Sequence, residues 1–181
     1  MKSCIFGAIA LALSTPAAWA TGVYSPESVA ATFYAVYVKL PPAGIPDTGT
    51  RNRLRPLVTV RLAALLRQGA DAERRYGKAT KGESPPLIEG DLFSSLFEGA
   101  NSFAVGACMT SGEESECAVT LAYGTTGAPD AKWMDYIYLV RERGQWKVDD
   151  ITYGGMWEFA NHGHVSDALE NAIAESRKPV N

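Results

Sequence analysis

The spacing of two cysteines, Cys108 and Cys117, constrains the fold of this chain more than any other feature. Residues 103–110 and 115–123 both have the composition of β-strands, and Gly112-Glu113 lies between them. Glycine in first position suits a two-residue type II′ turn. Counting outward from that turn places Cys108 opposite Cys117 in a non-hydrogen-bonded pair, where side chains approach most closely. The spacing therefore predicts an antiparallel hairpin closed by a disulfide.

A redox-active or metal-binding cysteine pair is the alternative interpretation. The two cysteines do not form a Cys-x-x-Cys motif, and no histidine stands near them at ligand spacing. We therefore interpret the Cys108–Cys117 pair as structural.

The first twenty residues read as an export signal. Lys2 is followed by an apolar run over residues 4–13 and by a small-x-small ending at Ala18-Trp19-Ala20. The run is too short for a resident membrane helix. We expect residues 1–20 to be a signal peptide that is cleaved after Ala20, and the mature protein to be periplasmic, where disulfides persist. Cys4 lies at the start of the apolar run and not at the cleavage point, so we expect no lipid anchor.

Residues 21–181 are long enough for one domain with a substantial core. The chain has 17 basic and 20 acidic side chains, a formal net charge of −3. This mild, mixed balance argues against a nucleic-acid partner, because nucleic-acid binders usually show a basic excess or a clustered basic face. The one dense basic cluster is Arg51, Arg53, Arg55 and Arg61, which we interpret as a solvated helix face.

Helical patterns come first along the chain. Ser25 caps a predicted helix that Pro41-Pro42 ends, and Thr59 caps a second over residues 60–77. We expect a short helical turn over 51–58 around Pro56, and another that Asp91 starts within the irregular segment 78–100. Ser166 is expected to cap a final helix over residues 167–176.

Strand patterns follow the helices from about residue 101. After the cysteine hairpin, residues 133–141 and 145–153 have the character of strands and are joined by a tight turn at Glu142-Arg-Gly144, and Gly154-Gly155 breaks the last strand. Short connections predict a four-stranded antiparallel meander. We therefore predict an α+β fold, with N-terminal helices packed on one face of a curved sheet and an additional C-terminal helix.

The ending from Gly144 to Ile151, with Trp146, Val148 and Asp149-Asp150, resembles the last strand of nuclear-transport-factor-2-like domains. Phe33-Tyr34, Gly90-Asp91-Leu-Phe93 and Trp146-Lys-Val-Asp-Asp-Ile151 further resemble the uncharacterised periplasmic proteins of the YbjP/YqhG type. The resemblance covers roughly residues 25–155. It implies a cone-like sheet with an apolar pocket and brings no established activity.

Acidic residues on the last two strands are candidates for chemistry. Asp135 is expected to enter the pocket with Trp133, where burial could raise its pKa and make it a general base. Asp149 and Asp150 are adjacent on a strand, so they point to opposite faces unless a bulge intervenes. The alternative is a rim acid that pairs with a neighbouring cation.

His162 and His164 form the one metal-like cluster, with Asp167 or Glu158 as a possible third ligand. The spacing of a helical His-x-x-x-His site is absent, so we interpret both histidines as surface residues. We also find no nucleophile elbow and no phosphate-binding glycine loop. The sequence predicts no metal and no cofactor.

These patterns lead us to expect a non-catalytic binding module for a small apolar ligand or an unknown protein partner. An immunity or inhibitor protein against an envelope-targeting toxin or hydrolase is one alternative. A small isomerase or hydrolase with Asp135 or Asp150 as its base is the other. Aromatic rings and acids that suit a pocket wall or an interface are the candidate binding residues: Tyr34, Tyr37, Asp91, Trp133, Asp135, Tyr136 and Trp157.

Overall fold

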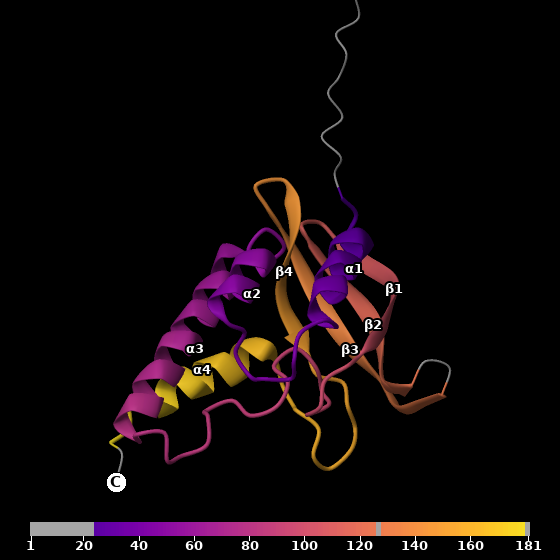
Figure 1. Ribbon diagram of the computed structural model, residues 1–181. Helices are drawn as coiled ribbons and strands as arrows, with labels where there is room; N and C mark the ends of the chain where they lie inside the picture. Colours follow the sequence, from indigo (N-terminus) through magenta and orange to yellow (C-terminus); the bar gives the residue numbers. More distant parts are fainter. Residues whose placement is uncertain (1–23, 126–127, 180–181) are drawn as a thin grey trace, which may run out of the picture.

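The computed structural model describes residues 24–125 and 128–179, which form an α+β fold (Figure 1). The predicted signal peptide lies outside the described residues. Four helices are described: α1 (Pro26–Tyr37), α2 (Thr48–Leu54), α3 (Val60–Ala79) and α4 (Val165–Glu175). The strands are β1 (Ser102–Ser111), β2 (Glu114–Thr125), β3 (Ala128–Glu142) and β4 (Gln145–Thr152).

The strands form one antiparallel sheet in the order β1-β2-β3-β4, which confirms the predicted meander. Gly112 has φ 62° in the β1–β2 turn, whereas Glu113 keeps a negative φ, as a type II′ turn requires. Arg143 and Gly144, between β3 and β4, have φ 55° and 77°, the positive pair that defines a type I′ turn. Both tight turns thus join the strands with the twist that hairpins favour.

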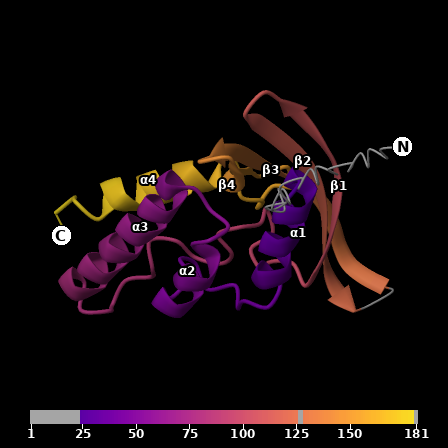
Figure 2. The same cartoon turned by 90° about the horizontal axis from the view of Figure 1, so that it is seen from above.

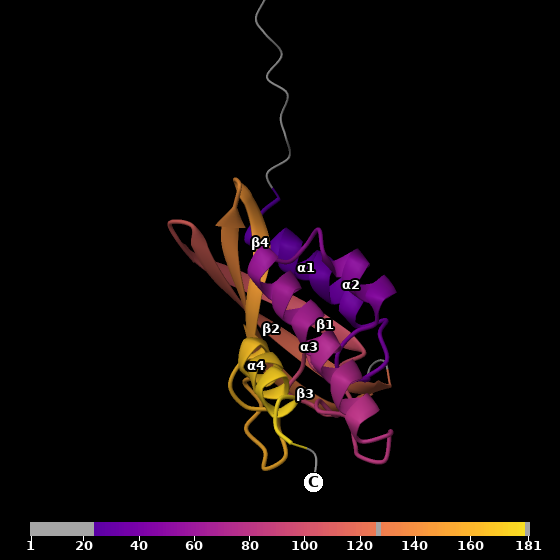
Figure 3. The same ribbon diagram turned by 90° about the vertical axis from the view of Figure 1, so that its left-hand side faces the viewer.

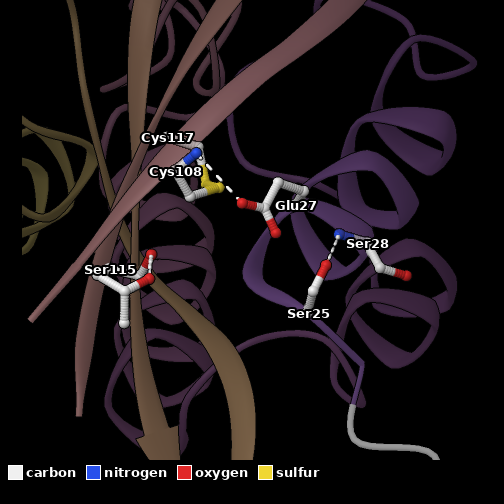
Figure 4. The surroundings of a disulfide bond; sticks show 7 residues. Ser25, Glu27, Ser28, Cys108, Ser115 and Cys117 are labelled. Carbon is white, nitrogen blue, oxygen red and sulfur yellow. Dashed lines mark hydrogen bonds between the residues drawn. A yellow bond between two sulfur atoms is a disulfide. The ribbon is translucent and has the colours of Figure 1, made fainter. Parts of the chain in front are cut away.

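The predicted disulfide is confirmed. Cys108 of β1 faces Cys117 of β2 with their Cα atoms 4.1 Å apart, and the bond between them closes the hairpin (Figure 4). The register outward from the turn is the one expected from the spacing, with Met109 opposite Glu116. Glu27 of α1 accepts a hydrogen bond from the Cys108 backbone N–H at 3.2 Å, so the stapled strand is also tied to the first helix.

Reduction of this disulfide is expected to lower the free energy of unfolding by about 2–3 kcal/mol, because the bond removes the entropy of a short loop from the unfolded chain. Urea denaturation of the oxidised and the reduced protein would measure the difference. The double variant Cys108→Ala/Cys117→Ala is the control and should not respond to reductant. Equal unfolding midpoints for the oxidised and reduced protein would contradict the prediction.

All the helices lie on one side of the sheet, as Figure 2 shows from above. The core forms between them and the inner sheet face, whose fully buried side chains include Val119, Leu121, Ile137, Leu139, Val148 and Ile151. From the helices, Phe33 of α1 and Leu62 of α3 pack against this face with no exposed surface. Helix α4 lies beside α3 and the end of β4 (Figure 3).

Helix starts follow the predicted caps in two of the four cases. The Ser25 hydroxyl accepts from the Ser28 N–H at 3.3 Å, and the Thr59 hydroxyl accepts from the Leu62 N–H at 3.0 Å. Each cap satisfies an amide that the first helical turn leaves without a partner. The starts of α1 and α3 are therefore confirmed.

The starts of α2 and α4 differ from the prediction. Helix α2 begins earlier, because Asp47 accepts from the Thr50 N–H at 2.7 Å, and it ends before Pro56. Helix α4 begins after His164, whose backbone N–H donates to Asp167 at 3.1 Å. Ser166 is not the cap because its hydroxyl donates to Asp150 instead.

The helical turn expected at Asp91 is absent, and residues 92–98 form bends and turns. The Asp91 carboxylate accepts from the Phe93 N–H at 2.8 Å, a local bond that competes with a helical start. Among residues 24–125 and 128–179, no helix has the length and apolarity needed to cross a membrane.

Candidate functional site

A cavity of about 220 Å³ opens between the end of α1, the loop that follows it, and the segment around Asp91. Its lining is mainly apolar and includes Tyr37, Leu40, Ile45, Thr50, Asp91 and Phe93. Cavities for drug-sized ligands measure roughly 300–1,000 Å³, so this one suits a smaller molecule. Apolar walls with a few polar groups are typical of small-molecule sites.

The loop after α1 is held against the Asp91 segment by backbone pairing. Gly44 forms an isolated parallel bridge with Asp91, and its N–H donates to the Gly90 carbonyl at 2.5 Å. Gly44 has φ 63°, and a Cβ there would collide with the Ile88 carbonyl oxygen. Glycine is therefore required at this position, and the approach that it permits forms one wall of the cavity.

Two acids line the cavity: Asp47 is exposed, whereas Asp91 is only 6% exposed. Burial raises the pKa of its carboxyl to about 7, although hydrogen bonds from the Phe93 N–H and the Tyr37 hydroxyl act in the opposite direction. A carboxyl with this pKa exchanges its proton near neutral pH. It can therefore donate or accept a hydrogen bond at the cavity wall.

Tyr37 joins the cavity to the aromatic core. Its hydroxyl accepts from the Ala100 N–H at 2.8 Å, and its ring packs edge-on against Phe93 and Tyr34. Burial raises the pKa of Tyr37 far above its usual value, so the hydroxyl keeps its proton. Tyr37 and Asp91 are the two predicted binding residues that the structure brings together at the cavity.

Tyr34 lies deeper, with no exposed surface. Its ring packs against Phe33, Tyr37 and Phe103 at centroid distances of 5.5–5.7 Å. Its hydroxyl has no hydrogen-bond partner among the described residues, and burial raises its pKa well above 10. These rings fill the space between α1 and the sheet, so Tyr34 belongs to the core and not to the wall of the cavity.

Asp135 lies on the inner face of β3 with Trp133 and Ile137 and is fully buried, but it does not enter the cavity that we expected it to line. Its carboxylate accepts from the Ser95 N–H and the Gly154 N–H, each at 2.9 Å, from the Trp133 indole N–H at 3.1 Å, and from the Ser95 hydroxyl. The hydrogen-bond donors to this carboxylate are groups of the protein itself, and Asp135 does not line the cavity. Its geometry is that of a structural acid which ties three segments together.

The other predicted binding residues lie apart from the cavity. Trp133 packs edge-on against Trp157 at a centroid distance of 6.0 Å, beside the Asp135 network. Tyr136 follows Asp135 on β3 and therefore points to the opposite face of the sheet. The structure thus brings Trp133, Asp135 and Trp157 together, and separates them from Tyr136.

Asp149 and Asp150 lie on the same side of β4 because a β-bulge intervenes. Tyr138 pairs with Asp150 and Leu139 with Val148, which leaves Asp149 as the extra residue. Arg61 of α3 reaches both acids, at 2.8 Å from Asp149 and 3.4 Å from Asp150. The bulge makes the pair one binding site for the guanidinium.

Each of these two acids also accepts a hydrogen bond from a residue at the start of a helix. The Thr59 hydroxyl donates to Asp149 at 2.7 Å at the beginning of α3. Asp150 accepts from the Ser166 N–H at 3.1 Å in the first turn of α4, where a negative charge is favourable. The geometry of Asp150 therefore favours an anchoring role over that of a catalytic base.

His164 and Asp167 interact with the start of α4. The His164 ring nitrogen Nδ1 lies 3.0 Å from the Thr152 hydroxyl, and Asp167 accepts from the His164 backbone. Among the described residues, no group of three or more His, Cys, Asp or Glu side chains is arranged to hold a metal ion.

Sequence reasoning missed Ile45, Thr50 and Ser95. Ile45 and Thr50 line the cavity, and Ser95 positions the Asp91 segment through Asp135. All three stand in segments without strong periodicity, and the contacts that reveal their roles span long sequence distances. The resemblance motif Gly90–Phe93 was the one signal near them.

No protein-family model, curated protein or solved structure matches this chain. The case for a function therefore depends on the geometry of the site.

Proposed function

We propose that this protein is a non-catalytic binding module of the periplasm that holds a small apolar ligand in the Asp91 cavity. The cavity itself carries the proposal: its walls are apolar, and Asp91 and Tyr37 offer polar groups that could orient a ligand. The Cys108–Cys117 disulfide is compatible with a protein that folds outside the cytoplasm.

We further propose that the fold is nuclear-transport-factor-2-like and of the YbjP/YqhG type. Helices on one face of an antiparallel meander, with the Trp146–Ile151 motif on the last strand, support this assignment. The ligand site that we propose lies at the edge of the helical layer, because aromatic side chains fill the space between α1 and the sheet.

Ala43→Phe is expected to weaken ligand binding, because Ala43 is an exposed residue that lines the cavity and a larger side chain would obstruct it. The neutral probes p-cresol, indole and cyclohexanol would be titrated into the protein and followed by amide NMR shifts. Shifts are expected near Tyr37, Thr50 and Asp91. The variant should bind at least about tenfold more weakly, a loss of about 1.4 kcal/mol.

Ala35→Phe is the matched control, because Ala35 is exposed on α1 and does not line the cavity. It should bind the probes as the unchanged protein does. If none of the probes gives saturable shifts, or if Ala43→Phe binds as well as Ala35→Phe, the cavity is not a ligand site.

Acid–base catalysis in the same cavity is a second candidate. The pKa of about 7 at Asp91 favours it, because a general acid or base works best when its pKa is near the operating pH. Chemical conversion of a bound compound, lost in Asp91→Asn while binding persists, would favour an enzyme over a binding module.

A further inference from the structure

A second and larger cavity, of about 580 Å³, lies between α2, the first turns of α3 and the β3–β4 turn. Figure 1 shows that turn beside the N-terminal end of α3. The floor includes the apolar side chains of Val58, Ala63 and Leu66, and the cationic side chains are Arg51, Arg55, Arg67, Arg143 and Lys147. We call this cavity the basic cleft.

Positive charge is concentrated in the basic cleft although the whole chain is acidic. Five cationic side chains and one carboxylate, Glu142, line it, which leaves a formal charge of +4 in a chain whose net charge is −3. The sequence cluster that we interpreted as a solvated helix face is divided in the structure. Arg51 and Arg55 line the cleft, whereas Arg61 pairs with Asp149 and Asp150.

The five cations have no acidic partner among the described residues. None of the ion pairs there includes Arg51, Arg55, Arg67, Arg143 or Lys147. Glu142 accepts from the Val60 N–H at 3.1 Å and so serves the start of α3. Glu142 offsets only one of the five positive charges, so the cations around the cleft repel one another, and an anion would relieve that repulsion.

The walls of the basic cleft are fixed to each other. The Val148 N–H donates to the Leu57 carbonyl at 2.8 Å, and the Thr59 N–H donates to the Val148 carbonyl at 2.9 Å. Lys147 of β4 also donates to the Pro56 carbonyl. These bonds join the α2–α3 connection to the edge of β4, so the cleft is formed before any ligand arrives.

Arg143 stands in a conformation that arginine does not favour. Its φ of 55° places it in the left-handed region, where type I′ turns usually have asparagine, aspartate or glycine. Retaining arginine there costs conformational energy, and such costs often mark functional positions. The substitution Arg143→Gly would remove both the conformational cost and the positive charge at this position.

We propose that the basic cleft binds a small molecule that carries two or more phosphate groups. A guanidinium matches phosphate with paired hydrogen bonds. Each phosphate monoester carries about −1.5 to −2 charges near neutral pH, so two groups balance the +4 of the cleft. A ligand with carboxylates instead of phosphates would need four of them in the same volume to balance this charge. The apolar floor accommodates the carbon framework between the phosphates.

Calorimetric titration of the purified protein would test this proposal, with fructose 1,6-bisphosphate as the probe and glucose 6-phosphate as its monophosphate comparator. The bisphosphate is expected to bind more tightly, and its affinity should fall when salt is raised from about 0.05 M to about 0.5 M. Phosphatidylcholine vesicles with and without cardiolipin distinguish a lipid headgroup from a free phosphate compound. We expect the soluble bisphosphate to compete with the vesicles.

The double variant Arg55→Gln/Arg67→Gln should weaken bisphosphate binding by at least about tenfold, since each guanidinium contributes charged hydrogen bonds. Arg74→Gln/Arg75→Gln removes the same charge from α3 outside the cleft and should change affinity by less than about twofold. Arg143→Gly should weaken binding while the melting temperature stays equal or rises. Weaker binding by a variant that is equally or more stable cannot be explained by loss of folding.

Three results would overturn the proposal. The first is the absence of measurable bisphosphate binding at low salt. The second is equal weakening by the cleft variant and by Arg74→Gln/Arg75→Gln, which would show non-specific attraction. The third is tighter binding of citrate than of the bisphosphate, which would show that the cleft selects carboxylates.

Discussion

Asp135→Ala is expected to lower the free energy of unfolding by at least about 4 kcal/mol. The change would leave donors from Ser95, Trp133 and Gly154 buried without an acceptor. Each orphaned donor costs about 1–3 kcal/mol, and these donors come from segments far apart in the sequence. Urea denaturation followed by tryptophan fluorescence would measure the loss, because Trp133 itself reports on the network.

Two further variants make the Asp135 prediction specific. Asp135→Asn keeps one acceptor oxygen but places an NH₂ group among donors, so its loss should be intermediate. Asp130→Ala changes an exposed acid on the same strand and should alter stability by no more than about 0.5 kcal/mol. If Asp135→Ala were no more destabilising than Asp130→Ala, the network would not contribute to stability.

The consequence of losing Asp135 reaches the Asp91 cavity. Ser95 follows Asp91 and Phe93 along the chain, and its hydroxyl also accepts from the Gly155 N–H at 2.9 Å. Nearby, the Tyr153 hydroxyl donates to the Leu92 carbonyl at 2.6 Å. The cavity wall is thus held from β3 and from the end of β4, which gives an irregular segment a defined position.

Features with local causes could be predicted from the sequence. The β1–β2 hairpin follows from its turn and from the strand-like composition on both sides of it, and the starts of α1 and α3 follow from side chains that cap their own helices. In each case the deciding interactions join residues that are close in sequence. The order of helices and strands then predicted the fold class.

Features with distant causes could not be predicted. The bulge at Asp149 depends on how β4 pairs with β3, and it decides that Arg61 can reach both acids. The cavity depends on the bridge between Gly44 and Asp91, which no local pattern indicates. The basic cleft likewise assembles side chains from α2, α3 and a β-turn, so its charge is dispersed in the sequence.

Asp91→Asn is expected to change how stability depends on pH, by roughly 4 kcal/mol between pH 4 and pH 8. Burial raises the pKa of Asp91 from 3.8 to about 7 in the folded protein. Between these values the folded state holds a proton that the unfolded state has released, so the free energy of unfolding falls as pH rises. The variant lacks this titration and should become the more stable protein above pH 7.

Urea denaturation of both proteins at intervals from pH 4 to pH 8 would measure this difference, and contributions from groups common to both cancel. Asp47→Asn is a control of opposite sign. The hydrogen bond from the Thr50 N–H lowers the pKa of Asp47 below its usual 3.8, so the unchanged protein should gain stability relative to that variant as pH rises to about 5, and the series for this control starts at about pH 2.5. Parallel curves for the unchanged protein and Asp91→Asn would show that Asp91 titrates as it does in the unfolded chain. That result would also remove the support which the raised pKa gives to a catalytic role for the cavity.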